Sequence, residues 1–165
     1  MARDALLPLA RRLGARLKKR RLRLVTAESC TGGWIAQAVT SVAGSSDWFD
    51  RGFVTYSNEA KKELLGVRAS TLSRHGAVSE ETAKEMAAGA LARSRAQVAI
   101  AVTGIAGPGG GSRTKPVGTV CFAWALKRRA PASVVRRFPG NREGIRRRSV
   151  AFALQGLLER LEERK

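Results

Sequence analysis

The segment that most constrains the fold is 97–104, QVAIAVTG, a nearly unbroken apolar run of strand length. A strand with one face in water alternates apolar with polar residues, whereas a strand covered on both faces reads as a continuous apolar run. We therefore expect 97–104 to lie in the middle of a sheet that has helices on both sides. With 165 residues, 44% of them hydrophobic, the chain can bury one substantial core of this kind.

Helical and strand patterns alternate along the rest of the chain. Two strand patterns are adjacent near the end, so we expect an α/β fold of three layers, α/β/α, with a mixed central sheet. A single domain spanning 1–165 is expected. The expected strands are 22–26, 53–56, 97–104, 117–126 and 133–138, and the expected helices are 4–19, 31–40, 59–65, 80–96 and 142–164.

Two of the expected helices carry capping signals. Asn58 is expected to be the N-cap of the short helix that stops at Gly66. Ser79 is expected to cap the helix that follows it, where Glu80 and Glu81 suit the positive end of the helix. Both signals mark where an irregular segment becomes helical.

Cysteine and histidine are sparse. Cys30 and Cys121 lie in unrelated contexts, which fit neither a disulfide framework nor a CxxC metal pattern, and both are expected to be packing residues. His75 is the only histidine, and its setting, LSRHGAVS, is typical of a loop before a helix. One histidine excludes a zinc site built on several, so we expect no metal and no cofactor.

The sequence carries no signal for a membrane or for secretion. No window approaches the roughly 18 uninterrupted apolar residues of a membrane span. Residues 1–23 are dense in Arg and Lys and lack the apolar core of a secretory signal. A soluble, cytoplasmic protein is therefore expected.

Net charge is the strongest compositional feature: 31 Lys and Arg oppose 13 Asp and Glu, which gives +18 at pH 7. Such a field attracts polyanions, so nucleic acid is the first partner to consider. The basic residues concentrate in 11–23 and 127–148, but aromatic residues make up only 5%, and no helix-turn-helix, zinc-finger or RNP pattern is present. Nucleic-acid binding through these basic segments is possible without being required.

The nine residues TAESCTGGW, 26–34, connect an expected strand to an expected helix. Ser29 would lie at this turn, beside free N–H groups and the positive end of the helix, where an anion or a developing oxyanion is stabilised. Gly32 and Gly33 would let a ligand approach the backbone closely. Spacing alone also fits a purely structural corner, in which a Ser or Thr caps the helix and the glycines allow tight packing.

A serine nucleophile at neutral pH needs a base. With His75 set aside, the candidates are lysine and tyrosine, and YSNEAKK, 56–62, supplies Tyr56 at a strand end and Lys61 five residues later. A lysine can serve as base if burial or neighbouring positive charge lowers its pKa. Spacing alone also allows a solvated helix lysine beside Lys62.

The glycine-rich segment AVTGIAGPGGG, 101–111, follows the central strand and is a second candidate binding segment. Turns of this kind let backbone N–H groups surround a phosphate, although this one matches neither the P-loop pattern nor GxGxxG. In sheets of this class, ligands bind beyond the carboxyl ends of the strands, and we expect both this loop and 26–34 to lie there.

Six blocks along the chain form a recognisable series: AESCTGG at 27–33, VTYSNEAKKELLGV at 54–67, HGAVSEETAKEMA at 75–87, AVTGIAGPGGG at 101–111, KPVGTV at 115–120 and FPGNREGIR at 138–146. In this order they resemble the CinA family, more narrowly its C-terminal, competence/damage-inducible domain, which acts as a nicotinamide-nucleotide amidohydrolase. The resemblance extends over nearly the whole chain, from about residue 21 to residue 158.

The resemblance implies hydrolysis of the carboxamide of nicotinamide mononucleotide, with nicotinic acid mononucleotide and ammonia as products and no metal. It implies that Ser29 is the nucleophile and that Lys61 with Tyr56 is the base. The implied substrate-binding residues are Cys30, Thr31, Gly32 and Gly33 around the oxyanion, and Thr103 and Gly104, with Arg142 or Lys115, around the ribose phosphate.

Some features depart from the family pattern. Many relatives carry a larger N-terminal domain that resembles molybdopterin-binding proteins, and the expectation here is the stand-alone form. Arg113 makes its loop more basic than is usual in the family. Two alternatives therefore stay open: a basic, nucleic-acid-associated protein with a vestigial active site, and an amidase of like mechanism with another substrate. A homo-oligomer, at least a dimer, is expected in either case.

Overall fold

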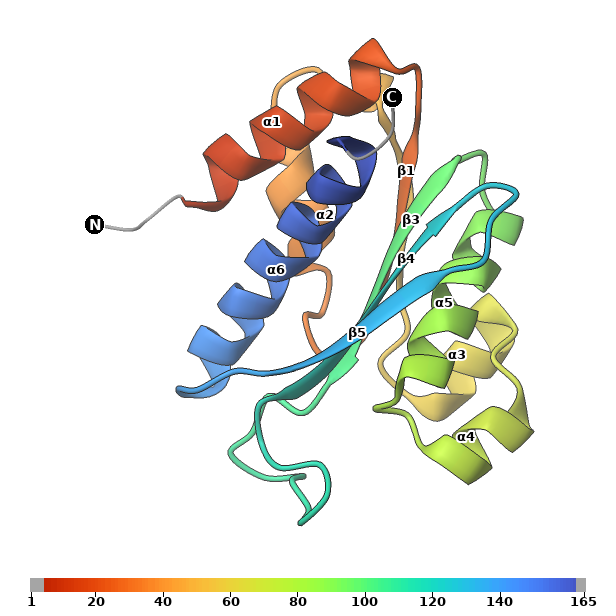
Figure 1. Cartoon of the computed structure of the whole chain (residues 1–165), viewed down its shortest axis with the longest axis vertical. Coiled ribbons are helices and arrows are strands. Elements are labelled where there is room, and N and C mark those ends of the chain that lie inside the picture. Colours follow the sequence, from red (N-terminus) through yellow and green to blue (C-terminus); the bar gives the residue numbers. More distant parts are fainter. Residues whose placement is uncertain (1–4, 163–165) are drawn as a thin grey trace.

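The computed structural model describes residues 5–162, whose elements run α1 (Leu6–Lys19), β1 (Leu24–Glu28), α2 (Trp34–Thr40), η1 (Ser45–Asp47), β2 (Phe49–Val54), α3 (Asn58–Leu65), α4 (Ala69–His75), α5 (Glu80–Ala92), β3 (Val98–Gly104), β4 (Thr119–Leu126), β5 (Ala132–Arg137) and α6 (Arg142–Glu162). The sheet order is β2-β1-β3-β4-β5. Strands β1, β2 and β3 are parallel, whereas β4 is antiparallel to β3 and β5 to β4. Helices α1, α2 and α6 cover one face and α3, α4 and α5 the other (Figure 1). The expected three-layer α/β fold with a mixed sheet is confirmed.

Strand β3 is the centre of the sheet, as its apolar run predicts. Its side chains alternate in size: Val98, Ile100 and Val102 pack in the core beneath α1, α2 and α6, whereas Ala99 and Ala101 pack against α5. The small side chains let α5 lie close to the sheet. One strand thus contributes side chains to the hydrophobic core on each face of the sheet. None of the helices within 5–162 is long and apolar enough to cross a membrane.

Some element boundaries differ from expectation, and two of these differences matter for the site. Strand β1 continues through Glu28, and β2 ends at Val54, so Tyr56 lies two residues beyond the strand instead of on it. His75 was expected in a loop but is the last residue of helix α4. This helix was not predicted because it has no apolar stripe and buries only Thr71.

The N-cap of α3 is Ser57, not Asn58. Ser57 has an extended backbone, and its hydroxyl accepts a hydrogen bond from the Ala60 N–H at 3.0 Å. The expected cap of α5 is confirmed, since the Ser79 hydroxyl accepts from the Thr82 N–H at 3.1 Å. Because Ser57 is the cap, α3 begins at Asn58, four residues after the end of β2, and Lys61 lies in its first turn.

Candidate active site

The candidate site lies where β1 and β3 end. After β1 the chain continues through α2 to β2, and after β3 it continues to β4 on the other side, so the two connections diverge at the carboxyl ends of these neighbouring strands and leave a crevice between them. Glu28 is in register with Val102, and the Ser29 N–H donates to the Val102 carbonyl at 3.0 Å. This bond fixes Ser29 at the edge of the sheet.

Ser29 and Lys61 form a buried pair. The Lys61 Nζ lies 2.9 Å from the Ser29 Oγ, 2.9 Å from the Thr55 carbonyl oxygen and 3.2 Å from the Tyr56 carbonyl oxygen. The lysine is 1% exposed, although it belongs to a helix on the surface of the domain. Of the two interpretations that the sequence allowed, the solvated lysine is therefore wrong.

Lys61 has three oxygen partners, which fit its amine in either protonation state. The ammonium donates to all three oxygens, whereas a neutral amine donates to the two carbonyls and accepts the hydroxyl proton of Ser29. Burial, which disfavours the charged form, lowers the Lys61 pKa. A Cys30 thiolate would oppose this effect, but burial raises the pKa of the Cys30 thiol to about 12, so the thiol stays neutral.

Tyr56 contributes its backbone to this pair. Its carbonyl oxygen accepts from Lys61, and from the Ser29 hydroxyl at 3.5 Å. Its side chain is 64% exposed, and the phenol oxygen accepts from Arg142 Nη2 at 3.3 Å. The hydroxyl of Tyr56, expected to share the role of base, therefore bonds to an arginine instead of the serine or the lysine.

The pair opens on a cavity of about 150 Å³. A cavity of this size accommodates one six-membered aromatic ring. Larger hollows exist, including one of about 370 Å³ beside Trp124 and Arg160, but its walls contain neither Ser29 nor Lys61. The walls of the small cavity are Ser29, Cys30, Tyr56, Lys61, Ala77, Val78, Thr103, Gly104, Ala106 and Arg142.

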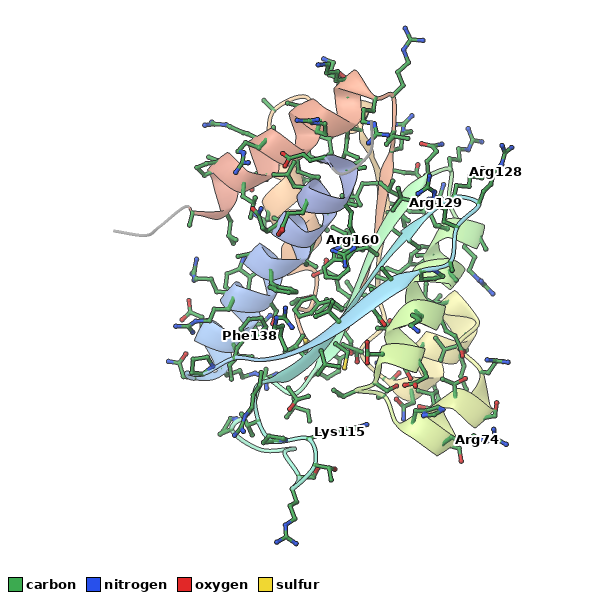
Figure 2. The ribbon with its side chains drawn as sticks, in the orientation of Figure 1. Arg74, Lys115, Arg128, Arg129, Phe138 and Arg160 are labelled. Atoms are coloured by element: carbon green, nitrogen blue, oxygen red, sulfur yellow. The ribbon has the colours of Figure 1, made fainter. Side chains whose placement is uncertain are left out.

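The structure brings only some of the other expected binding residues to this cavity. Thr103 is on its wall, and its hydroxyl donates to the Ala77 carbonyl at 2.9 Å. Lys115 is not on the wall. It lies on the loop between β3 and β4 (Figure 2), and its ammonium donates to the carbonyl of His75, the last residue of α4, at 2.7 Å. Of the expected residues, Cys30, Gly104 and Arg142 are also wall residues, whereas Thr31, Gly32 and Gly33 are not.

Glu28, which the sequence analysis did not single out, organises the start of α2. Its carboxylate is 1% exposed and accepts from the Thr31 hydroxyl at 2.6 Å, the Ile35 N–H at 2.8 Å and the Ala36 N–H at 3.0 Å. Burial raises the pKa of Glu28, and these hydrogen bonds oppose the rise. The N–H groups at the start of α2, expected to be free for an anion, are thus occupied by the protein's own carboxylate.

The nucleophile turn, which we define as 29–33, retains two other donors. Its backbone hydrogen bonds use the N–H groups of Ser29 and Gly32, and in the part of the chain that the structure describes, those of Cys30 and Thr31 donate to no backbone carbonyl. A second missed residue, Arg146 of α6, donates to carbonyls of this turn. No spacing in the sequence indicates that contact, because Arg146 stands in a run of three arginines.

Comparison with known proteins identifies the family. Residues 6–161 match the model of the CinA C-terminal domain. This chain belongs to that family. Nicotinamide-nucleotide amidohydrolase PncC of Escherichia coli strain K12 is 53% identical to this CinA domain over 157 residues, which cover 95% of each chain. The protein of the same name from Pseudomonas putida is 51% identical, over 94% of this chain and 97% of its own.

Solved structures have the same fold. The competence/damage inducible protein CihA from Agrobacterium tumefaciens is 50% identical to this CinA domain, with a TM-score of 0.92 over 95% of each chain. The competence damage-inducible protein A (ComA) from Klebsiella pneumoniae subsp. pneumoniae is 41% identical, with a TM-score of 0.94 over 98% of this chain and 100% of its own. The likeness extends over nearly the whole length of each chain.

Proposed function

We propose that this CinA domain hydrolyses the carboxamide of nicotinamide mononucleotide and releases nicotinic acid mononucleotide and ammonia. The observation that carries the proposal is the buried pair of Ser29 and Lys61, 2.9 Å apart at the wall of a cavity. A nucleophile with an adjacent base is what acyl transfer from an amide requires. The names of the PncC relatives, which match along nearly their whole length, support the substrate class.

In the first half of the proposed reaction, the Ser29 oxygen attacks the amide carbon while the Lys61 amine accepts the hydroxyl proton. The former carbonyl oxygen becomes an oxyanion, which backbone N–H groups of the nucleophile turn stabilise. Lys61 then returns the proton to the departing nitrogen, so the C–N bond breaks and ammonia leaves an ester on Ser29. In the second half, Lys61 takes a proton from water as the water oxygen attacks the ester carbon, and it returns this proton to the Ser29 oxygen as the C–O bond to Ser29 breaks. The product leaves as the acid, whose carboxyl group loses its proton to solvent, and Ser29 and Lys61 are restored.

The cavity and its rim suggest how the substrate is oriented. The pyridine ring matches the cavity of about 150 Å³, whereas a whole nucleotide exceeds it, so the ribose phosphate extends toward the rim. Arg142 is exposed there, and its guanidinium, held by the Gly107 carbonyl at 2.7 Å and the Tyr56 hydroxyl, has further N–H groups for a phosphate. This favours Arg142 over Lys115 as the phosphate ligand.

The test is ammonia release from nicotinamide mononucleotide by the purified protein, with and without a chelator. We expect release that survives chelation and is lost in a Ser29→Ala variant. The dephosphorylated nucleoside should be a much poorer substrate, because it cannot use Arg142. Equal rates on nucleotide and nucleoside would indicate an amidase for another substrate, and no release from folded wild-type protein would refute the proposal.

A second candidate function, association with nucleic acid, is favoured by charge at the opposite end of the sheet. We call this surface the basic end; its exposed members are Lys18, Lys19, Arg21, Arg23, Arg51, Arg93, Arg95, Lys127, Arg128 and Arg129. Strand register brings these segments together, and Figure 2 shows Arg128 and Arg129 far from Lys115. The test is the slope of DNA-binding affinity against salt concentration, which reports how many phosphates the protein neutralises. A slope that corresponds to more than a few phosphates would support this function, and a flat salt dependence would refute it.

A further inference from the structure

The nucleophile turn is held by an arginine from a distant part of the chain. Arg146, in α6, donates through Nε to the Cys30 carbonyl at 3.0 Å and through Nη2 to the Thr31 carbonyl at 3.2 Å. Gly32 leaves room for the guanidinium, since a Cβ there would lie 3.3 Å from Arg146 Nη2. Two consecutive carbonyls of the turn are thus bound by one rigid, planar group.

These bonds fix the direction of two peptide groups. In a trans peptide, the C=O of one residue and the N–H of the next point to opposite sides of a rigid plane. With the Cys30 carbonyl on Arg146, the Thr31 N–H points away from Arg146. The Gly32 N–H belongs to the next peptide group and is already used, because it donates to the Ser29 carbonyl at 3.0 Å. Thr31 is fully buried and not on the cavity wall, so the donor of this turn that a ligand in the cavity can reach is the N–H of the wall residue Cys30, in the peptide group that precedes the two held by Arg146.

We propose that Arg146 is a positioning residue, which holds the Cys30 and Thr31 carbonyls and so fixes the nucleophile turn in the conformation that directs the Cys30 N–H, at the cavity wall, to the oxyanion formed next to Ser29. The inference rests on the proposed function. Arg146 is not on the cavity wall, so it acts through the backbone and not on the substrate. Arg142, four residues earlier on α6, is on the wall, so one helix positions both the phosphate ligand and the nucleophile turn.

Arg147 offers a matched control. The guanidinium groups of Arg146 and Arg147 both lie over the Trp34 ring, at 5.5 and 5.0 Å from its centroid. Arg147, however, donates to Glu143 of its own helix at 3.3 Å and makes no hydrogen bond to the nucleophile turn among the described residues. Arg147→Met removes a cation, its contact with Trp34 and an exposed ion pair with Glu143 that contributes little, whereas Arg146→Met removes a cation, its contact with Trp34 and the two carbonyl bonds. The difference between the two variants isolates the bonds.

The kinetic test measures ammonia release from nicotinamide mononucleotide by wild type, Arg146→Met, Arg146→Lys and Arg147→Met. We expect Arg146→Met to lower kcat roughly 10- to 100-fold with KM nearly unchanged, because a misdirected oxyanion donor weakens transition-state binding only. Arg146→Lys keeps a donor for one carbonyl and should recover part of the loss, whereas Arg147→Met should stay within about twofold of wild type. The midpoint of the pH profile should not move, because Lys61 sets it.

A second measurement does not depend on the substrate. The backbone amide signals of Thr31 and Gly32 in ¹H–¹⁵N NMR spectra should shift or broaden in Arg146→Met and stay in place in Arg147→Met. Equal kcat in the two methionine variants, with an unchanged Thr31 signal, would overturn the proposal. If wild type released no ammonia while the Thr31 signal still moved in Arg146→Met, the proposed function would fall, and the positioning of the turn by Arg146 would stand.

Discussion

The two ends of the central sheet differ in the exposure of their ionisable side chains, which are buried at one end and exposed at the other. At the carboxyl ends of β1 and β3, Glu28 and Lys61 are each 1% exposed and each has three hydrogen-bond partners. At the basic end, many cationic side chains stay in water. Buried ionisable groups act through their position, whereas exposed charged groups act through their summed field, which salt screens. Substitutions at the first end should therefore change turnover by orders of magnitude, and those at the second should change it little.

The largest effect is expected for Lys61→Met, which removes the base but keeps an unbranched side chain of similar length in the buried position. We expect kcat for ammonia release to fall roughly a thousandfold, as is typical of a lost general base. Circular dichroism would establish that the variant is folded. A folded Lys61→Met protein with kcat within tenfold of wild type would refute the role of the lysine.

The pH dependence should distinguish the buried lysine from the exposed ones. Burial lowers the Lys61 pKa from the ordinary value of 10.5, and only the neutral amine accepts the Ser29 proton. We therefore expect kcat to be high above the folded-state pKa and to fall as the pH drops through it. Rates measured from neutral to alkaline pH would contradict this if they showed no such rise.

The same pKa has a consequence for stability. Between the lowered folded-state pKa and 10.5, the unfolded chain carries a proton on Lys61 that the folded chain does not. Stability rises with pH wherever the unfolded state binds more protons, so the free energy of unfolding should rise through this window. Denaturant titrations at several pH values should show this slope in wild type and a smaller one in Lys61→Met. Equal slopes would mean that Lys61 titrates normally.

A smaller effect is expected for Glu28→Gln, which keeps the shape of the side chain. One carboxylate oxygen serves the Thr31 hydroxyl and the Ile35 N–H, and the other serves the Ala36 N–H. The amide NH₂ of Gln would replace one acceptor by a donor and leave a buried N–H unsatisfied, which costs about 1–3 kcal/mol. Denaturant unfolding measures this loss, and an unchanged midpoint would show that the carboxylate is not needed at the turn.

The smallest effect on turnover is expected for Arg128→Gly at the basic end. Arg21 and Arg128 are the two non-glycine residues with positive φ in 5–162, at 56° and 69°. The left-handed conformation costs roughly 1–2 kcal/mol in a residue with a Cβ, so glycine should raise the free energy of unfolding by a fraction of that amount. We expect kcat within about twofold of wild type and a shallower salt dependence of DNA binding. A marked loss of turnover would show that the two ends are coupled.

Local patterns predict part of this molecule, and tertiary contacts supply the rest. The run 97–104 predicts the central strand because burial on both faces leaves a mark in the sequence itself. The bond between Arg146 and the Cys30 carbonyl has no such signal in the sequence, because it joins residues 116 positions apart. Only the packing of α6 against α2 determines which arginine of the run of three makes it. The phenol of Tyr56 was expected to act with Lys61 on Ser29. Because β2 ends at Val54, it is the backbone carbonyl of Tyr56 that contacts Lys61.

The central claim is that Ser29 attacks the amide with Lys61 as its base. Its most direct test is the mass of the intact protein, quenched with acid during turnover of nicotinamide mononucleotide. The account predicts an adduct with the mass of the substrate less ammonia, located on Ser29 by peptide digestion and absent from Ser29→Ala. Ammonia release that persists in Ser29→Ala, with no adduct on the wild-type protein, would contradict it, because water would then attack the amide directly.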